Sequence, residues 1–376
     1  MSANILEVKD WKWKKRFIDF PHDLFEGDPN YVPEIFLGQK DLLSEKSNPF
    51  FQHSKAQLFL ALRNEKIVGR IAAIRNNNYN EFASANAGFF GFFDVIEDYE
   101  VAKLLLDTAC NWLKKEGLDD VIGPANFSTN DTAGLLVEGF DRPPVIMMTY
   151  NKPYYAEFLE RYGFQKQMDL LAYHGTHATT NRKSLELSQR IQERLAGKGI
   201  TFRNPDMRKF KEELVNVRKV YLGSWDKNWG FVPPTDAEFD HMAEGLKMVI
   251  DPRFAIFAEH EGRLVGFALA VPDINTVAKN IKRGRLFPFG IFKLLLQKSK
   301  IKSVRVILLG VLPEYRKMGI EGIFYAKILS KGIELGHTHG EASWILDNNE
   351  MMKKGVEHAG MKPYKRYRMY EKPLAE

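Results

Sequence analysis

The sequence predicts an α/β protein made of two copies of one fold, each with a mixed central sheet, packed into one body. Short apolar segments typical of strands alternate with segments of helical spacing in both halves of the 376 residues. Three landmarks also recur 197 residues further along the chain, namely Gly69 and Gly266, Asn151 and Asn348, and Gly163 and Gly360. We therefore expect an N-terminal extension and a first copy in residues 1–178, and a second copy in residues 179–376.

The composition favours a protein with large cores and an anionic partner. Hydrophobic residues make up 44% of the chain, and the net charge of +6 favours nucleotide phosphates or an anionic membrane surface. The one cysteine, Cys110, excludes an internal disulfide and is typical of a reducing compartment. Residues 1–20 carry no apolar signal-peptide core, and no apolar stretch is long enough to cross a bilayer. We expect a cytoplasmic location.

The first half begins with an extension, residues 1–55, in which aromatic residues are frequent but regular patterns are few. Residues 57–74 predict a β-hairpin, because two apolar segments flank a turn at Asn64–Lys66. Strands and helices then alternate: a strand at Ala87–Phe93, a helix at Val101–Trp112, a strand at Asp120–Ile122, a helix at Tyr154–Arg161 and a strand at Leu170–Tyr173.

The second half repeats this plan, with a hairpin in residues 254–271. Val304–Leu309 is rich in β-branched residues and leucine, which is typical of a strand covered on both faces, and Pro313 ends it. A helix begins at Gly319, since apolar residues follow it at helical spacing. A further strand is expected at Ala342–Leu346.

The turn before the Gly319 helix has the chemistry of a diphosphate-binding site. Arg316 and Lys317 supply two cations, and Gly319 allows a ligand to approach the backbone closely. The free N–H groups at the start of a helix are further donors to an anion.

The first copy lacks these features at the positions that we expect to be equivalent. If Gly91 corresponds to Gly310, Glu97 and Glu100 stand where the second copy has Arg316 and Gly319. Carboxylates repel a diphosphate, so we expect only the second copy to bind an anionic cofactor.

Arg316-x-x-Gly319, preceded by a strand and Gly-Val-x-Pro, resembles the acyl-CoA-binding motif of the GNAT acyltransferases, Arg/Gln-x-x-Gly-x-Gly/Ala. The last motif position is Glu321 here, and Gly322 comes one residue late. More narrowly, most of the chain resembles the bacterial ceramide-synthase-like group, in the segments Asn48–Phe51, Gly91–Phe93, Gly123–Ser128 and Gly134–Phe140.

This resemblance implies a tandem GNAT fold and an acyl-CoA-dependent N-acyltransferase whose acceptor is a long-chain or lipid-like amine. The candidate acyl-CoA-binding residues are Leu309, Val311, Arg316, Lys317, Met318, Gly319, Ile320 and Asn348. In GNAT enzymes an Asn near the position of Asn348 commonly contacts the cofactor arm, and a role as helix N-cap explains this residue equally well. Tyr367 is the candidate acid for the departing thiolate, with Tyr364 and Tyr370 as competitors.

Residues 123–144 are dense in small polar groups, and such a loop on a rigid scaffold can line a substrate site. Amide formation requires a neutral amine, so a carboxylate near the acceptor would take its proton. Glu138 and Asp131 are the candidates for this base. The alternative interpretation is a long surface loop held by Asx turns.

Lys279–Arg305 contains many basic residues and no acidic residue, with leucine and phenylalanine interleaved. A basic, apolar segment of this kind is compatible with peripheral contact with an anionic surface such as the inner membrane. It could equally cover an acyl chain or a nucleotide phosphate, or form a core helix with solvated lysines.

Two other functions remain open. A non-enzymatic acyl-CoA or lipid-binding protein is compatible with Glu321, which departs from the motif. An aminoacyl transferase of the tandem-GNAT type, which uses tRNA, is compatible with the positive charge. The histidines show no H-E-x-x-H pattern and no cysteine pairing, so we predict no metal site. We recognise no nucleic-acid-binding module and expect no nucleic-acid partner.

Overall fold

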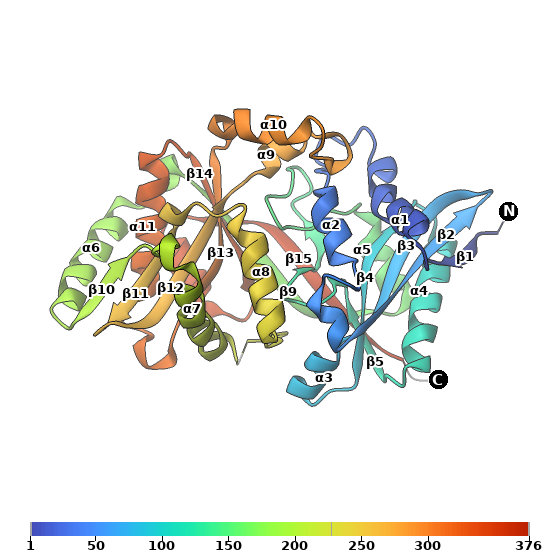
Figure 1. Cartoon of the computed structure of the whole chain (residues 1–376), viewed down its shortest axis with the longest axis horizontal. Coiled ribbons are helices and arrows are strands. Elements are labelled where there is room, and N and C mark those ends of the chain that lie inside the picture. The colour runs from blue at the N-terminus through green and yellow to red at the C-terminus, as the bar shows by residue number, and fades with distance from the viewer. Residues whose placement is uncertain (1, 227, 375–376) are drawn as a thin grey trace.

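Two α/β halves lie side by side on one continuous mixed sheet of 13 strands (Figure 1). This architecture comes from a computed structural model, which describes residues 2–226 and 228–374. It confirms the predicted α/β class and mixed sheet. Among the described residues, no helix is long and apolar enough to cross a membrane.

The first half contains the elements β1 (Asn4–Glu7), α1 (Trp11–Leu24), α2 (Phe36–Leu42), β2 (Lys55–Arg63), β3 (Lys66–Arg75), α3 (Asn77–Ala83), β4 (Ala87–Val95), α4 (Tyr99–Lys115), β5 (Asp120–Gly123), β6 (Ala125–Asn126), β7 (Thr132–Ala133), β8 (Leu135–Glu138), α5 (Tyr154–Tyr162) and β9 (Gln165–Thr176). The predicted hairpin is β2–β3, and its turn has Asn64 and Glu65 at positive φ.

The second half contains α6 (Arg182–Ala196), β10 (Ile200–Arg203), α7 (Phe210–Trp225), α8 (Asp236–Lys247), β11 (Ala255–His260), β12 (Arg263–Pro272), α9 (Asn275–Ala278), α10 (Gly290–Leu296), β13 (Ser303–Val311), α11 (Ile320–Glu334), β14 (His339–Leu346), α12 (Glu350–His358) and β15 (Lys362–Pro373). Gly163 and Gly360, which are 197 residues apart, occupy the same position in the two halves. Each lies just before the last strand of its half, β9 or β15.

The N-terminal extension is more regular than the sequence predicted. β1 pairs with β2, and α1 begins after Asp10, whose side chain accepts a hydrogen bond from Trp13 N at 2.9 Å. One face of α1 buries Phe17 and Phe20. The prediction of little regular structure in residues 1–55 was wrong, because Trp13, Phe17 and Phe20 repeat at the spacing of a helix that packs on the sheet.

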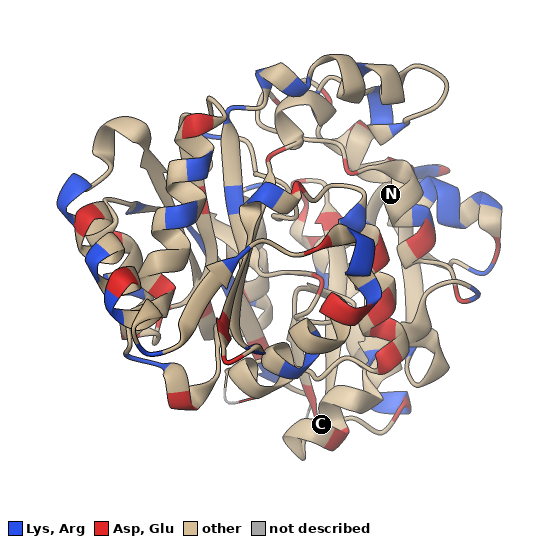
Figure 2. Ribbon diagram, turned by 60° about the vertical axis from the view of Figure 1, so that its left-hand side comes forward, with Lys and Arg blue, Asp and Glu red and all other residues tan. Residues whose placement is uncertain are grey.

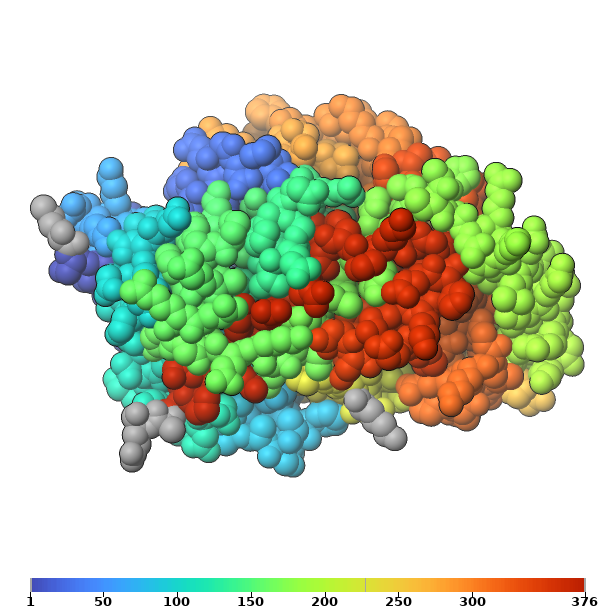
Figure 3. Space-filling view, turned by 180° about the vertical axis from the view of Figure 1, so that it is seen from behind, coloured from blue at the N-terminus to red at the C-terminus, as the bar shows by residue number. Residues whose placement is uncertain are grey.

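The two halves exchange their last strands. The sheet runs in the order β1-β2-β3-β4-β5-β15-β9-β14-β13-β12-β11-β10. β15, which ends the second half, therefore pairs with β5 of the first half, and β9, which ends the first half, pairs with β14 of the second. β9 and β15 also pair with each other. Seen from behind, the C-terminal residues reach across onto the first half (Figure 3).

The strand registers correct the equivalence that we expected between the two copies. Gly69 lies opposite Val95, and Gly266 lies opposite Val311. Since Gly69 and Gly266 correspond, the equivalent of Val311 is Val95, and the pairing of Gly91 with Gly310 was wrong. The turn after β4 is consequently short and the turn after β13 is long, so Glu97 and Glu100 are not the counterparts of Arg316 and Gly319.

The residues between β12 and β13 form a cap over one edge of the molecule, at the top of Figure 1. We call residues 274–302, with α9 and α10, the cap. The interpretation of this segment as a core helix was wrong, because Phe289 and Leu296 are 74% and 81% exposed.

Candidate active site

A gap opens between the central strands of the second copy. β13 and β14 pair in parallel only from Ser303 to Val306 on β13 and from His339 to Ala342 on β14. Beyond this point β13 has an irregularity at Ile307 in its pairing with β12, and β14 has one after Ala342 in its pairing with β9. The following residues of β13, Ile307 to Leu309, are only half-buried. The strand predicted to be covered on both faces is therefore only half-buried at its centre, in the part that does not pair with β14.

The corresponding gap in the first copy is filled. β4 pairs in parallel with β5 only from Ala87 to Phe89. Ala125 and Asn126 of β6 then occupy the space, and the side chain of Asn126 accepts a hydrogen bond from Phe92 N at 2.7 Å. Gly91 permits this contact, since a Cβ there would lie 2.0 Å from the carbonyl oxygen of Ala125. The first copy thus offers no equivalent opening.

The turn that follows β13 is held by Arg316. Its guanidinium donates to the carbonyl oxygen of Val311 at 3.1 Å and to that of Ser224 in α7 at 2.8 Å. This predicted phosphate-binding side chain therefore braces the turn. Lys317, at φ 63°, is exposed beside it, and Gly319, at φ 92°, adopts a backbone conformation that favours glycine.

The start of α11 is uncapped, in contrast with the start of α4. Gly319 occupies the N-cap position and supplies no side-chain acceptor. The backbone N–H groups of Met318, Gly319 and Ile320 donate no hydrogen bond to any described residue. In the first copy, Asp98 caps α4 by accepting from Glu100 N at 3.0 Å. The second copy therefore presents unsatisfied donors at its helix start, which is an arrangement that binds anions.

A buried polar cluster lies beside the gap, on the face of the sheet opposite α11. Glu341 of β14 is 1% exposed and accepts hydrogen bonds from the hydroxyl groups of Ser343, at 2.5 Å, and Tyr364. Arg305 of β13, its neighbour in the parallel pairing, lies 3.9 Å from the Glu341 carboxylate and donates to Ser343 Oγ at 2.9 Å. Burial raises the pKa of the Glu341 carboxyl, which the nearby Arg305 charge opposes.

Two further polar groups of this region have no partner among the described residues, the Tyr367 hydroxyl and the Trp344 ring N–H. Tyr367 is fully buried, and its pKa is raised by burial and by the negative charge of Glu341. The competing tyrosines are both occupied, since Tyr364 donates to Glu341 and Tyr370 donates to Glu160 at 3.1 Å. Tyr367 is therefore the one of these three tyrosines whose hydroxyl has no hydrogen-bond partner among the described residues.

The candidate bases chosen from the sequence lie elsewhere. Glu138 is on β8, with its side chain 64% exposed and paired with Arg366 at 3.1 Å. Asp131 accepts from Phe127 N and from Ser128 Oγ, each at 3.3 Å, and so holds the turn of its own loop. Burial raises the pKa of Asp131 to about 6. Their roles as bases stay predictions.

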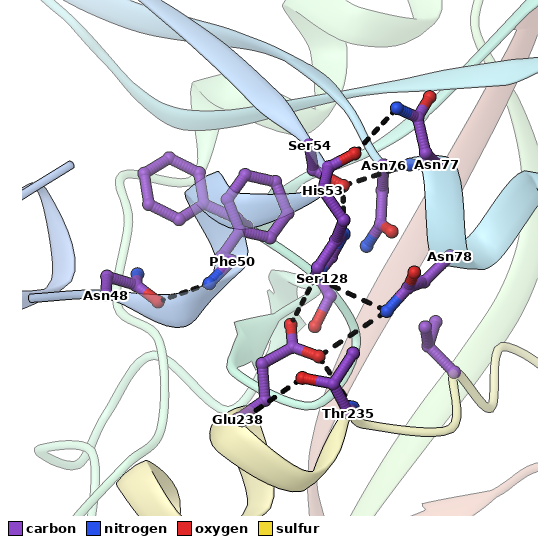
Figure 4. A network of polar contacts seen from close by, with 12 residues as sticks. Asn48, Phe50, His53, Ser54, Asn76, Asn77, Asn78, Ser128, Thr235 and Glu238 are labelled. Atoms are coloured by element: carbon purple, nitrogen blue, oxygen red, sulfur yellow. Dashed lines mark hydrogen bonds and ion pairs between the residues drawn. The ribbon is translucent and has the colours of Figure 1, made fainter. Parts of the chain in front are cut away.

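The loop of Asp131 joins the two halves instead of standing free. Asn130 donates to the carbonyl oxygen of Val232 at 2.7 Å. Beside it, His53 of the first half lies 3.0 Å from Glu238 of α8, and Ser128 lies close to this pair (Figure 4). This network joins residues of the two halves through side-chain contacts.

Asn348 is exposed at the end of β14, next to the gap. The cap of the following helix is its neighbour Asn349, which accepts from Met352 N at 3.1 Å. The alternative role of Asn348 as N-cap was therefore wrong, and contact with a cofactor stays a prediction. Among the described residues, no group of three potential metal-ligating side chains is found.

Sequence reasoning missed Glu341, Arg305 and Ser343. Arg305 was counted with the basic residues of Lys279–Arg305, although it belongs to β13 and is 3% exposed. The sequence nevertheless contains a signal for this pair. The strand His339–Leu346 has a single Glu, and the strand Ser303–Val311 has a single Arg. If both strands are central in the sheet, these two charges are buried and need a partner.

No family model matches the chain. Over 380 residues it is 35% identical to a protein of Caulobacter vibrioides (strain NA1000 / CB15N) named bacterial ceramide synthase, covering 99% of this chain and 98% of that protein. Over 369 residues it is 36% identical to protein YghO of Escherichia coli (strain K12), covering 96% and 93% of the two chains.

Solved structures with the same fold are GNAT proteins. One is a tandem GNAT protein from the clavulanic acid biosynthesis pathway, with a TM-score of 0.59, 11% identity and coverage of 100% of this chain and 99% of that one. Another is a GCN5-related N-acetyltransferase from Sphaerobacter thermophilus, with a TM-score of 0.54, 11% identity and coverage of 99% and 96%.

These similarities confirm both levels of the resemblance found in the sequence, the tandem GNAT fold and the narrower group. The chain therefore belongs to the family of the bacterial ceramide synthase and YghO, and it has the tandem GNAT fold.

Proposed function

We propose that the protein transfers an acyl group from acyl-CoA to the nitrogen of a long-chain or lipid-like amine. The observation that carries this proposal is the open gap between β13 and β14. In the same copy, the uncapped start of α11 suits a diphosphate, and the buried side chains of Glu341 and Tyr367 suit proton transfer.

The donor site would be formed by the second copy alone. The backbone N–H groups of Met318, Gly319 and Ile320 would bind the diphosphate, with Lys317 beside them and Arg316 holding the turn. Leu309, Val311 and Asn348 would line the arm that leads to the thioester. The acyl-CoA supplies an activated acyl carbon, which an amine can attack.

Glu341 is our preferred general base in place of Glu138 or Asp131. It lies on β14, where it pairs with Arg305 of β13 one residue before the parallel pairing ends at Ala342. A carboxylate whose pKa is raised by burial accepts a proton more readily than an ordinary one, as removal of a proton from an ammonium requires. The unpaired hydroxyl of Tyr367 would give a proton to the departing thiolate.

The nature of the acceptor is supported by the relative named bacterial ceramide synthase. Ceramide is the amide of a long-chain amino alcohol, so the corresponding acceptor for this chain is a long-chain primary amine with a fatty acyl-CoA as donor. Acyl-CoA is a cytoplasmic metabolite, so the proposed reaction is cytoplasmic, and the acceptor would be drawn from the surface of the inner membrane.

Release of free thiol from a panel of acyl-CoAs, with mass-spectrometric detection of the amide, tests this proposal. We expect thiol and amide in equal amounts with a long-chain amine and little thiol without one. Binding of acyl-CoA without thiol release for any amine would instead indicate a non-enzymatic binding protein. Amide formed only from an aminoacyl-tRNA would indicate an aminoacyl transferase.

A further inference from the structure

The cap carries a concentrated group of exposed apolar side chains. Five large hydrophobic residues of this short segment are 55% to 81% exposed: Phe287, Phe289, Phe292, Leu295 and Leu296. Exposed apolar residues are common when scattered singly, but a cluster of aromatic and leucine side chains indicates a surface that binds something apolar.

The same surface is basic. Lys279, Lys282, Lys298 and Lys300 are exposed around the apolar residues, and residues 279–302 contain no Asp or Glu. Lysine and arginine residues of the cap are visible at the top of Figure 2. This combination of exposed phenylalanine, leucine and lysine side chains suits the surface of a lipid bilayer, where apolar acyl chains lie beneath anionic head groups.

The base of the cap is fixed to the first half, so that its apolar side is held outward. Arg283 forms an ion pair with Asp23 of α1, and Arg285 donates to both oxygens of Asp19 at 2.9 Å. Gly284 lies against the backbone of Glu34, where a Cβ would be 1.8 Å from the carbonyl oxygen. The two arginines are thus used for anchoring, whereas the lysines remain available to a partner.

We propose that the cap docks the protein on an anionic lipid bilayer, with its phenylalanine and leucine side chains inserted and its lysines at the phosphate groups. This inference does not depend on the reaction, because it concerns binding to a surface. A bilayer explains both the exposed apolar side chains and the exposed lysines of the cap. An acyl-chain tunnel would instead have buried Phe292 and Leu295.

A second copy of the chain is a poorer occupant. In a symmetric dimer each cap would face its equal, and the exposed lysines of one cap would meet those of the other. Like charges brought together in this way oppose association, while anionic lipids favour it.

The cap also connects the surface to the candidate active site. At its first end, Asp273 accepts from Ile146 N at 2.8 Å and Asn275 donates to the carbonyl oxygen of Pro144 at 2.9 Å. At its second end, Arg305 donates to the carbonyl oxygen of Ile146 at 2.7 Å and contacts Ser343. Residues at both ends of the cap therefore bind the segment 144–146 of the first half, close to Glu341. An acceptor drawn from the bilayer at the cap would thus enter near the proposed general base.

Flotation with vesicles tests the proposal. Wild-type protein should float with vesicles of equal parts phosphatidylglycerol and phosphatidylcholine, less so in high salt, and should not float with phosphatidylcholine alone. An apolar variant should lose flotation at any salt: Phe289→Ser, Phe292→Ser and Leu296→Ser combined. A basic variant should bind the anionic vesicles at least tenfold more weakly: Lys282→Gln, Lys298→Gln and Lys300→Gln combined.

Matched controls carry the same chemical changes at exposed positions away from the cap. Leu187, Val215 and Met248 are 57%, 56% and 85% exposed, and their combined change to Ser should leave flotation unchanged. The same holds for a change to Gln at three exposed lysines: Lys115, Lys198 and Lys211. All variants should keep the thermal midpoint of the wild type.

The proposal is overturned if the apolar variant floats as well as wild type, or if the controls lose flotation equally. It is also overturned if wild type does not float and sediments as a dimer that the cap variants convert to monomers, since the cap would then bind a second copy.

Discussion

Glu341 and Arg305 form a pair of buried charged side chains, an arrangement that contributes little to the stability of a fold. Both side chains are nearly inaccessible to solvent. Burial raises the pKa of the Glu341 carboxyl and lowers the pKa of the Arg305 guanidinium, so it favours the neutral form of each. Hydrogen bonds from Ser343 and Tyr364 compensate the carboxylate. A well-packed apolar pair would stabilise the fold at least as well, so the presence of this pair suggests a use other than stability.

The first prediction concerns Glu341→Gln, which keeps the shape of the side chain and removes its basicity. We expect kcat for amide formation to fall about 100-fold or more while the affinity for acyl-CoA stays near wild type. We also expect wild type to lose activity at low pH, where Glu341 is protonated, and the variant to lack this loss in its pH profile of kcat.

Glu138→Gln is the matched control, because Glu138 is exposed and lies at the surface pair with Arg366. It should change kcat less than about twofold. If Glu138→Gln abolishes turnover and Glu341→Gln does not, the base is the residue that the sequence first suggested.

The second prediction concerns Asp273, whose pKa burial raises from 3.8 to about 6. The Asp273 carboxyl binds its proton more tightly in the folded state than in the unfolded state. The resulting stabilisation of the folded protein is fully present below about pH 4 and is lost as pH rises through 6. Asp273→Asn retains an oxygen that can accept from Ile146 N and Asn275 N. We expect it to raise the free energy of unfolding by about 1–3 kcal/mol at pH 8.

Urea unfolding at pH 4 and at pH 8 measures this effect. The stability of the variant relative to wild type should grow as pH rises. An equal difference at the two pH values would show that the carboxyl of Asp273 titrates normally in the folded protein.

At the residue scale the sequence located the turn residues Lys317 and Gly319 and the tyrosine that has the unpaired hydroxyl, Tyr367. It did not locate Glu341, because two of the three residues that contact its carboxylate, Arg305 and Tyr364, come from other strands. Tyr364 is distant in the sequence, and Arg305 is separated from Glu341 by a whole helix.

At the scale of elements, the functional contrast lies in two helix starts. α4 is capped by Asp98, which also pairs with Arg63 at 2.7 Å, whereas α11 begins at a glycine with free N–H groups. The same contrast appears in the sheet, where β6 fills the gap of the first copy. One fold therefore has an uncapped helix start in one copy, and a capped helix start with a filled gap in the other.

The third prediction tests the turn before α11. Lys317→Glu places a carboxylate beside the helix start and should weaken CoA binding by about 1–3 kcal/mol, measured by titration calorimetry. Arg316→Glu is less informative, because it also removes the hydrogen bonds to Val311 and Ser224.

Lys66→Glu, in the exposed turn of the first hairpin, makes the same change of charge and should leave CoA binding unchanged. Equal losses for the two variants would mean that the net charge of the protein, and not this turn, governs binding.

The elements themselves were largely predictable, and their alignment between copies was not. The hairpins and the helix after β13 follow from local patterns of apolar residues and turns. Gly91 and Gly310 were wrongly matched because each position needs a glycine for close packing, but against a different neighbour. Gly91 accommodates Ala125, whereas Gly310 lies against Trp225.

At the scale of the whole molecule, the exchange of β9 and β15 makes the two copies one folding unit. The fourth prediction is that urea unfolds both halves in a single transition. Leu105→Ala, in the core of the first half, should lower the stability of that one transition by about 2–5 kcal/mol.

Circular dichroism and tryptophan fluorescence should report the same midpoint for this variant. Two separate transitions, with only the earlier one shifted by Leu105→Ala, would mean that the halves unfold independently in spite of the exchanged strands.

The repeat in the sequence predicted two copies and could not predict this exchange. Each final strand pairs with residues far away in the chain, and the local pattern of a strand is the same whichever partner it has. The domain boundary at residue 178 marks the sequence repeat, while the sheet continues across it.

The central claim is that two copies share one fold and only the second binds the acyl donor. Hydrogen–deuterium exchange of the intact protein, with and without a long-chain acyl-CoA, tests it most directly. We predict slower exchange in residues 307–323 on adding the donor, and unchanged exchange in residues 91–101 of the first copy. Protection of residues 91–101, or equal protection of both segments, would contradict this account.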